Sequence, residues 1–200
     1  MMKSCSVTVD VDCLRSNFKG FGLKKPRYSF RELEIGTENI LSFFSHYGIR
    51  ATFFVVAQDV QTESNAKLVK RIFRSGHEIA SHSLSHPQGF RLLPESERRL
   101  ELQKSKAILE DVTGQPVIGF RAPGWNISDD TIPILRAFGY RYDSSVFPTM
   151  LMPLLKTMHY YSMRKRDLPT RTTLGHLYYM YAPTHPYHTD ENALGKKGSI

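Results

Sequence analysis

Cysteine is scarce in this chain, with only Cys5 and Cys13 among 200 residues. Two cysteines are too few for the disulfide framework of a small secreted scaffold, and their spacing excludes a C-x-x-C zinc site. The pair can in principle bridge, but we expect free thiols in a reducing compartment.

Long apolar segments are also missing. No stretch approaches the ~20 apolar residues that a transmembrane helix needs. The residues after Met1 lead almost directly into a predicted strand, which leaves no room for the apolar region of a signal peptide. We therefore expect no transmembrane segment and a cytoplasmic location, with a signal removed from the sequence as the alternative.

Acidic residues are fewer than basic ones, 19 against 27, and the formal net charge is +8. Such an excess is either ordinary for a soluble basic protein or attracts an anionic partner. Much of it is local, in two groups: Lys19, Lys24, Lys25 and Arg27, then Lys156, Arg164, Lys165, Arg166 and Arg171. The second group mingles with tyrosines, which suits an anionic lipid or a sugar phosphate. No nucleic-acid-binding motif is present, so we expect no nucleic-acid partner.

The composition is that of one globular domain spanning residues 1–200, with 40% hydrophobic and 23% charged residues. Strand-like and helix-like segments alternate over its first two thirds. The predicted strands are 4–9, 50–57, 78–81, 117–120 and 140–143. The predicted helices are 32–47, 65–74, 94–112 and a helix to 138 capped by Ser128. This alternation predicts an α/β fold with parallel strands and helical crossovers.

The alternation fails after residue 145. The segment 149–200 is rich in Pro, Tyr, His and Met, and we expect it to be irregular, with a short apolar turn at 151–155 and a strand near 174–181. Five βα units do not close a (β/α) barrel, which usually needs ~250 residues. We therefore predict a distorted barrel that is incomplete at its C-terminal side, with 147–200 packed more loosely than 4–145.

Two carboxylates, Asp10 and Asp12, lie at the end of the first predicted strand. Residues i and i+2 of a strand point to the same side, so both carboxylates can face one site. Two carboxylates that lie so near each other must bind a cation or share a proton. The alternative is an ordinary polar strand end.

Two histidines four residues apart, His82 and His86, follow the third predicted strand. On one turn of chain they can bind one metal ion through ring nitrogens. Such pairs also occur by chance, but this one lies at the carboxyl end of a strand, where barrel active sites are found. His77, before the strand, is expected to be structural.

Two further groups follow the fourth and fifth strands. Arg121, Pro123 and Trp125 can orient a carboxylate and form an apolar wall, or they are a plain loop with one packed aromatic ring. Asp143 can pair with Arg121, or it belongs to a simple turn. The four groups together fall on one face of the predicted barrel, and this coincidence favours an active site.

The order Asp-x-Asp, HSLSHP, FRAPGW and DSS resembles the successive motifs of the polysaccharide deacetylase (NodB-like, carbohydrate esterase family 4-like) family, over residues 4–148. The resemblance implies a divalent metal, usually zinc, with cobalt, nickel or iron as alternatives. It implies Asp12, His82 and His86 as ligands and Asp10 as general base, held by Arg121. It also implies that Pro123 and Trp125 line the substrate groove. We count Asp143 with Asp10 and Arg121 as a catalytic candidate, because it can pair with Arg121.

The activity implied is hydrolysis of N-acetyl groups on amino sugars of a polysaccharide or a lipid- or phosphate-linked saccharide, as in exopolysaccharide assembly. Two departures leave alternatives open. Val11 separates aspartates that are adjacent in most relatives, which keeps small linear or cyclic amides as possible substrates. The family's leucine-x-histidine motif, which supplies a general acid, is not found; His185 and His188 are the nearest candidates. Its absence also fits a motif beyond Ile200, or a catalytically impaired protein that only binds glycan.

Overall fold

The computed structural model describes residues 5–12, 31–164, 175–190 and 193–198. Its centre is a parallel sheet in which five strands follow one another in sequence order. The strands are β1 (Val7–Val11), β2 (Ala51–Val55), β3 (Glu78–Ser81), β4 (Gly119–Phe120) and β5 (Tyr142–Asp143). The predicted α/β fold with parallel strands is confirmed.

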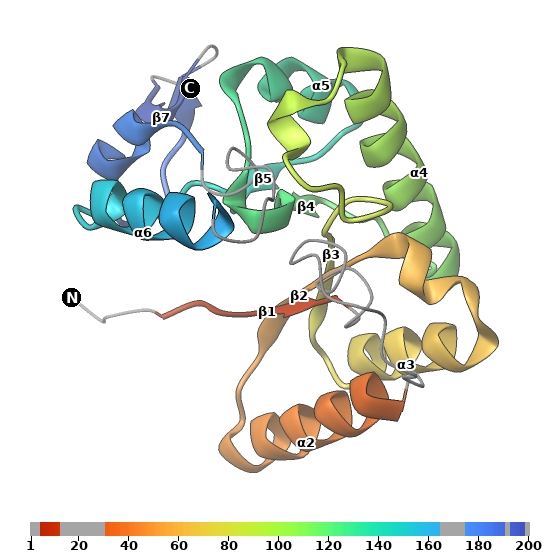
Figure 1. Cartoon of the computed structure of the whole chain (residues 1–200). Helices are drawn as coiled ribbons and strands as arrows, with labels where there is room; N and C mark the ends of the chain where they lie inside the picture. Colours follow the sequence, from red (N-terminus) through yellow and green to blue (C-terminus); the bar gives the residue numbers. More distant parts are fainter. Residues whose placement is uncertain (1–4, 13–30, 165–174, 191–192, 199–200) are drawn as a thin grey trace.

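Helices connect the strands and lie around the outside of the sheet (Figure 1). They are α2 (Arg31–Tyr47), α3 (Glu63–Arg74), α4 (Glu95–Thr113) and α5 (Ile132–Ala137). Short 3-10 turns join them: η1 (Ala57–Gln61), η2 (Phe90–Leu92), η3 (Pro123–Trp125) and η4 (Asp129–Thr131). Among the described residues no helix is long and apolar enough to cross a membrane.

Strand β2 is buried on both faces, as expected for a central strand between layers. Phe53 packs toward α2, where its ring lies 6.1 Å from that of Phe44. Phe54 points the opposite way, and the guanidinium of Arg121 lies 4.1 Å from its ring centre. Alternation along one strand thus separates the core beneath the helices from the interior of the barrel.

The register of the sheet aligns the carboxyl ends of all five strands. Val11 pairs with Val55, Val55 with Ser81, Ser81 with Phe120, and Phe120 with Asp143. Strand β1 therefore lies later in the chain than the predicted strand 4–9, because pairing with β2 extends to Val11. Asp10 lies within the strand as a result, and Asp12 follows it directly.

Several local predictions are wrong. The predicted helix after Ser128 divides into η4 and α5, and the Ser128 hydroxyl donates to Asp130 instead of capping the helix. The predicted turn at 151–155 is part of helix α6 (Met152–Arg164), and the predicted strand near 174–181 is the 3-10 turn η5 (Leu177–Tyr181). Tertiary contacts override local preference at both places, since Met152 and Tyr179 are buried.

The described tail is anchored to the body of the domain. Tyr179 lies in the main hydrophobic core, and the Asp129 carboxylate accepts hydrogen bonds from the hydroxyls of Tyr178 and Tyr179 and from the Leu194 amide. A hairpin of β6 (Thr189–Asp190) and β7 (Ala193–Lys197) follows. Helix α6 leaves Leu154 and other apolar side chains exposed.

Candidate active site

The aligned strand ends bring together groups that lie far apart in the sequence. One row of paired residues crosses the sheet at the carboxyl ends of the strands. The residues that directly follow this row on β1, β3, β4 and β5 are Asp12, His82, Arg121 and Ser144. Because parallel strands end at one edge of the sheet, the motifs form one site.

Arg121 organises the first half of this site. Its Nη1 donates to Asp10 Oδ1 at 2.6 Å, and its Nη2 donates to Thr8 Oγ1 at 3.1 Å and to Ser144 Oγ at 2.7 Å. Its Nε donates to the Ser144 carbonyl at 3.1 Å. The predicted contact with Asp10 is present, but the guanidinium is shared among three residues and does not form a fork on one carboxylate.

His82 is fully buried and is oriented by a backbone carbonyl. Its Nδ1 lies 2.8 Å from the Arg121 carbonyl oxygen. Since a carbonyl only accepts, Nδ1 carries the proton and Nε2 keeps its lone pair. Burial lowers the pKa of His82, although the charges of Asp10 and Asp12 oppose this shift. A neutral, oriented imidazole is the form that binds a metal ion.

His86 lies close to both Asp12 and His82. Its Nε2 is 3.6 Å from Asp12 Oδ2, and its ring centre is 5.1 Å from that of His82. Its Nδ1 is buried and has no hydrogen-bond partner. The two histidines do not share a helical turn: they belong to an irregular loop in which Ser83 and His86 have φ values of 68° and 55°.

The donors fit a divalent ion in kind. One carboxylate and two imidazoles are ligands that zinc accepts, and they leave further positions open for water and substrate. The nitrogen of half-buried His86 that would bind the ion together with Asp12 is Nε2, which lies 3.6 Å from Asp12 Oδ2. Within the described ranges, however, no three His, Cys, Asp or Glu side chains are gathered closely enough to hold an ion.

The rim of the site is formed by the loop after β4. The Trp125 ring is partly exposed and stacks on Phe147 with ring centres 5.5 Å apart. Pro123 is buried and therefore offers little surface to a ligand. Trp125 is exposed at this rim, and the assignment of both residues to a substrate groove stays a prediction.

Asp143 does not bond to Arg121, contrary to one expectation. Its carboxylate accepts hydrogen bonds from the Ser145 amide at 2.9 Å and the Ser145 hydroxyl at 2.6 Å. The same hydroxyl oxygen accepts from the Ala122 amide at 2.7 Å. Burial raises the pKa of Asp143 to about 6, against these hydrogen bonds and the charge of Arg121. In this arrangement Asp143 joins the end of β5 to the rim loop.

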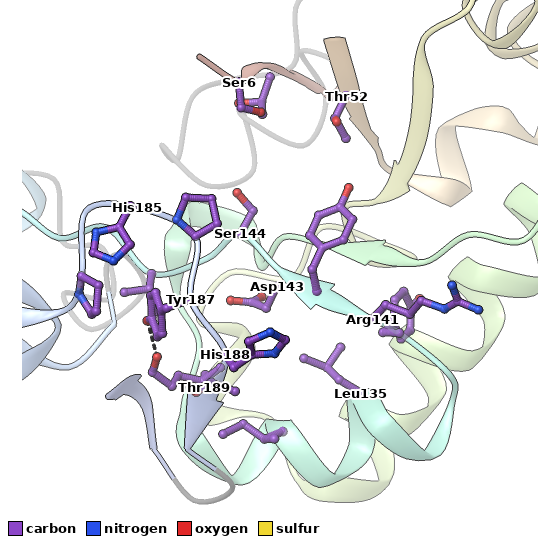
Figure 2. Close-up of a pocket in the computed structure, with 18 of the residues that line it drawn as sticks. Ser6, Thr52, Leu135, Arg141, Asp143, Ser144, His185, Tyr187, His188 and Thr189 are labelled. Atoms are coloured by element: carbon purple, nitrogen blue, oxygen red, sulfur yellow. Dashed lines mark hydrogen bonds between the residues drawn. The ribbon is translucent and has the colours of Figure 1, made fainter. Parts of the chain in front are cut away.

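A cavity of about 710 Å³ lies beside this site, between β1, β5 and the tail (Figure 2). Thr8 and Ser144, two partners of Arg121, line it together with Asp143. His185 and His188 also line this cavity, whereas the two histidines after β3 do not. The two tail histidines therefore face a different space from the candidate ligands.

Three contributors were not singled out from the sequence. Thr8 and Ser144 hold Arg121, and Glu101 of α4 accepts hydrogen bonds from the loop that carries the histidines. Ser144 is the middle residue of the DSS motif and Thr8 lies two residues before Asp10, so both can be found by their position. Glu101 stands in a charged helix where no pattern distinguishes it from its neighbours.

Known proteins resemble this chain over the same region. The family model "Polysaccharide deacetylase" matches residues 33–142, which is more than half of the chain but excludes Asp10 and Asp12. The peptidoglycan deacetylase of Helicobacter pylori is 31% identical over 120 residues, covering 60% of this chain and 40% of that protein. The chain thus spans well under two thirds of that relative.

Solved structures are also similar to this chain. A polysaccharide deacetylase structure from Mycobacterium smegmatis superposes with a TM-score of 0.60 at 27% identity, covering 71% of this chain and 50% of that one. A CE4 family pseudoenzyme from Bacillus anthracis superposes with a TM-score of 0.55 over 85% of this chain and 52% of that one, and at 20% identity shows the shared fold alone. The region that the family model matches contains His82, His86 and the Arg121 loop. Because this match covers more than half of the chain, the chain belongs to the polysaccharide deacetylase family.

Proposed function

We propose that this protein is a metal-dependent hydrolase that removes N-acetyl groups from amino sugars of a polysaccharide or a lipid-linked saccharide. The observation that carries the proposal is the ion pair of Arg121 with Asp10, which lies beside Asp12, His82 and His86 at the aligned strand ends. A paired carboxylate next to two imidazoles and a second carboxylate suits the hydrolysis of an amide.

Asp12, His82 and His86 are the residues that would hold the ion. A divalent ion supplies a Lewis acid toward an acetyl carbonyl and lowers the pKa of water. The proposed ion is zinc, with cobalt, nickel or iron as alternatives. Its orienting contacts come from the chain itself, since the Arg121 carbonyl fixes the ring of His82.

Asp10 is the proposed general base. Arg121 Nη1 donates to one of its carboxylate oxygens, Oδ1, at 2.6 Å, which leaves Oδ2 to accept a proton from water. Trp125 would bind the apolar face of a sugar ring at the rim. Asp143 is assigned a positioning role, because Ser145 occupies its carboxylate and ties it to the rim loop.

The proposed setting is cytoplasmic, on a phosphate- or lipid-linked saccharide during exopolysaccharide assembly, which suits a net charge of +8. Small amides on the same scaffold are the second candidate substrates, since Val11 separates the two aspartates. Acetate release from an N-acetylglucosamine oligomer, and ring opening of a cyclic amide to one product that carries a new carboxylate and a new amino group, distinguish these substrate classes.

The test measures zinc content and acetate release by the purified protein, before and after chelation and zinc addition. We expect one zinc ion per chain and activity that returns with zinc. His82→Ala should lose the ion, whereas His46→Ala, at an exposed histidine of α2, should keep it. Activity that is unchanged by complete chelation, or zinc bound normally by His82→Ala, refutes the proposal.

A further inference from the structure

The loop that carries His86 has a backbone that needs external support. Ser83 and His86 both adopt left-handed conformations, with φ values of 68° and 55°, although neither is glycine. Such conformations cost energy in residues with a side chain and persist where surrounding contacts determine them. The contacts of this loop therefore decide where His86 lies.

The carboxylate of Glu101 accepts three hydrogen bonds from this loop. Its Oε2 accepts hydrogen bonds from the amides of Leu84 and Ser85, both at 2.9 Å, and its Oε1 accepts one from the Ser85 hydroxyl at 2.7 Å. The side chain extends from the middle of α4, which packs against β3, and Glu101 is buried. A carboxylate forms stronger hydrogen bonds than a neutral acceptor, so this group holds both amides firmly.

Other contacts secure the base of the loop independently of Glu101. Ser81 bonds through its hydroxyl to Ser105 of α4 at 2.7 Å. The carbonyls of Ser83 and Leu84 accept from the amides of Ala57 and Gln58. Removal of Glu101 therefore leaves the loop attached to β3 and to the segment after β2, but frees the amides between the two left-handed residues.

We propose that Glu101 is a positioning residue for the metal site: its carboxylate holds the Leu84 and Ser85 amides and so fixes His86 beside Asp12. This inference rests on the proposed metal-dependent function. It assigns a role to a helix residue that touches neither the ion nor the substrate and that lies far from the motifs in sequence.

Glu110 provides a matched control on the same helix. Its carboxylate accepts the Val117 amide at 2.9 Å and pairs with Lys106 at 2.8 Å. It therefore also joins α4 to a following backbone segment, but at the opposite end of β4 from the site. A purely structural role for Glu101 predicts that Glu101→Ala and Glu110→Ala behave alike.

The experiment compares the full-length wild type with Glu101→Ala, Glu101→Gln and Glu110→Ala. Zinc affinity is measured by competition with a chromophoric chelator, and amide hydrogen exchange is followed at residues 84 and 85. We expect Glu101→Ala to bind zinc ~10- to 100-fold more weakly, the range for loss of a group that orients a ligand. Exchange at both amides should accelerate.

The remaining variants separate positioning from stability. In Glu101→Gln the amide oxygen can accept both backbone N–H groups and the amide nitrogen can donate to Ser85, so most of the zinc affinity should return. Glu110→Ala should lose thermal stability but keep wild-type zinc affinity. Wild-type affinity together with unchanged exchange in Glu101→Ala overturns the inference.

The failure of the proposed function has a different signature. A wild type that binds no zinc refutes the metal site itself, and with it the assignment of Glu101 to that site. The exchange rates at residues 84 and 85 then still decide whether Glu101 holds the loop, because they need no metal.

Discussion

Replacing Arg121 with lysine keeps the positive charge beside Asp10 but removes the planar guanidinium. The arginine reaches four acceptors: Asp10 Oδ1, Thr8 Oγ1, and the hydroxyl and carbonyl of Ser144. A lysine ammonium is a single nitrogen on a flexible stem and cannot reach all four. If it keeps Asp10, it loses up to three bonds to neutral acceptors.

Each of those bonds contributes about 0.5–1.5 kcal/mol, so Arg121→Lys should lower the free energy of unfolding by roughly 2–4 kcal/mol. Loss of the contact with the Phe54 ring adds a smaller amount. Because Asp10 loses its fixed orientation, kcat should fall by about 10- to 100-fold, a typical effect of a displaced catalytic group.

Urea unfolding followed by the fluorescence of Trp125, the only tryptophan, measures the first effect, and acetate release measures the second. Arg98→Lys is the matched control. Arg98 is also buried and donates two 2.7 Å bonds to Asp130, but it lies on α4 away from the site. It should lose stability and keep kcat. An Arg121→Lys protein within about 0.5 kcal/mol of wild type and with unchanged kcat refutes the reasoning.

Three further predictions concern carboxylates. Asp10→Asn should keep zinc but lose at least ~10²-fold in kcat, as for a general base; retained turnover would make Asp10 merely structural. Asp143 has a folded pKa of about 6, above its unfolded value, so its stabilising contribution is complete below about pH 4 and is lost as pH rises through 6. Asp143→Asn should therefore gain stability relative to wild type between about pH 4 and 7, by at most ~3 kcal/mol, and urea titrations with no such trend would contradict this shift. Asp129→Ala removes the acceptor of the Tyr179 hydroxyl and the Leu194 amide, so proteolysis should cut first within 175–198; unchanged cleavage would show that the tail is held by other contacts.

The strands and most helices could be predicted because a buried segment has a recognisable local pattern of residue types. Phe53 and Phe54 lie in a short β-branched and aromatic segment, and Gly48, Gly76 and Gly114 follow helices with left-handed φ values that suit glycine. The tail could not be predicted in this way. Its 3-10 turn at Leu177–Tyr181 depends on Asp129, about fifty residues earlier in the chain.

The residues that come together at the candidate site could be predicted from the sequence. Asp10, Asp12, His82, His86 and Arg121 stand at strand ends, and parallel strands bring their carboxyl ends to one edge, so the composition of the site followed from order alone. Their hydrogen-bond partners did not follow, because those depend on which side chains the packing brings within about 3 Å.

The contact of Arg121 with Asp10 was expected from the family resemblance, but only the tertiary structure decided that Thr8 and Ser144 share the guanidinium and that Ser145 occupies Asp143. It also decided that Glu101, a helix residue with no local mark, holds the histidine loop. The physical reason is the same in both cases. Periodicity records which side of an element is buried, whereas a hydrogen bond depends on the meeting of two surfaces that no single segment encodes.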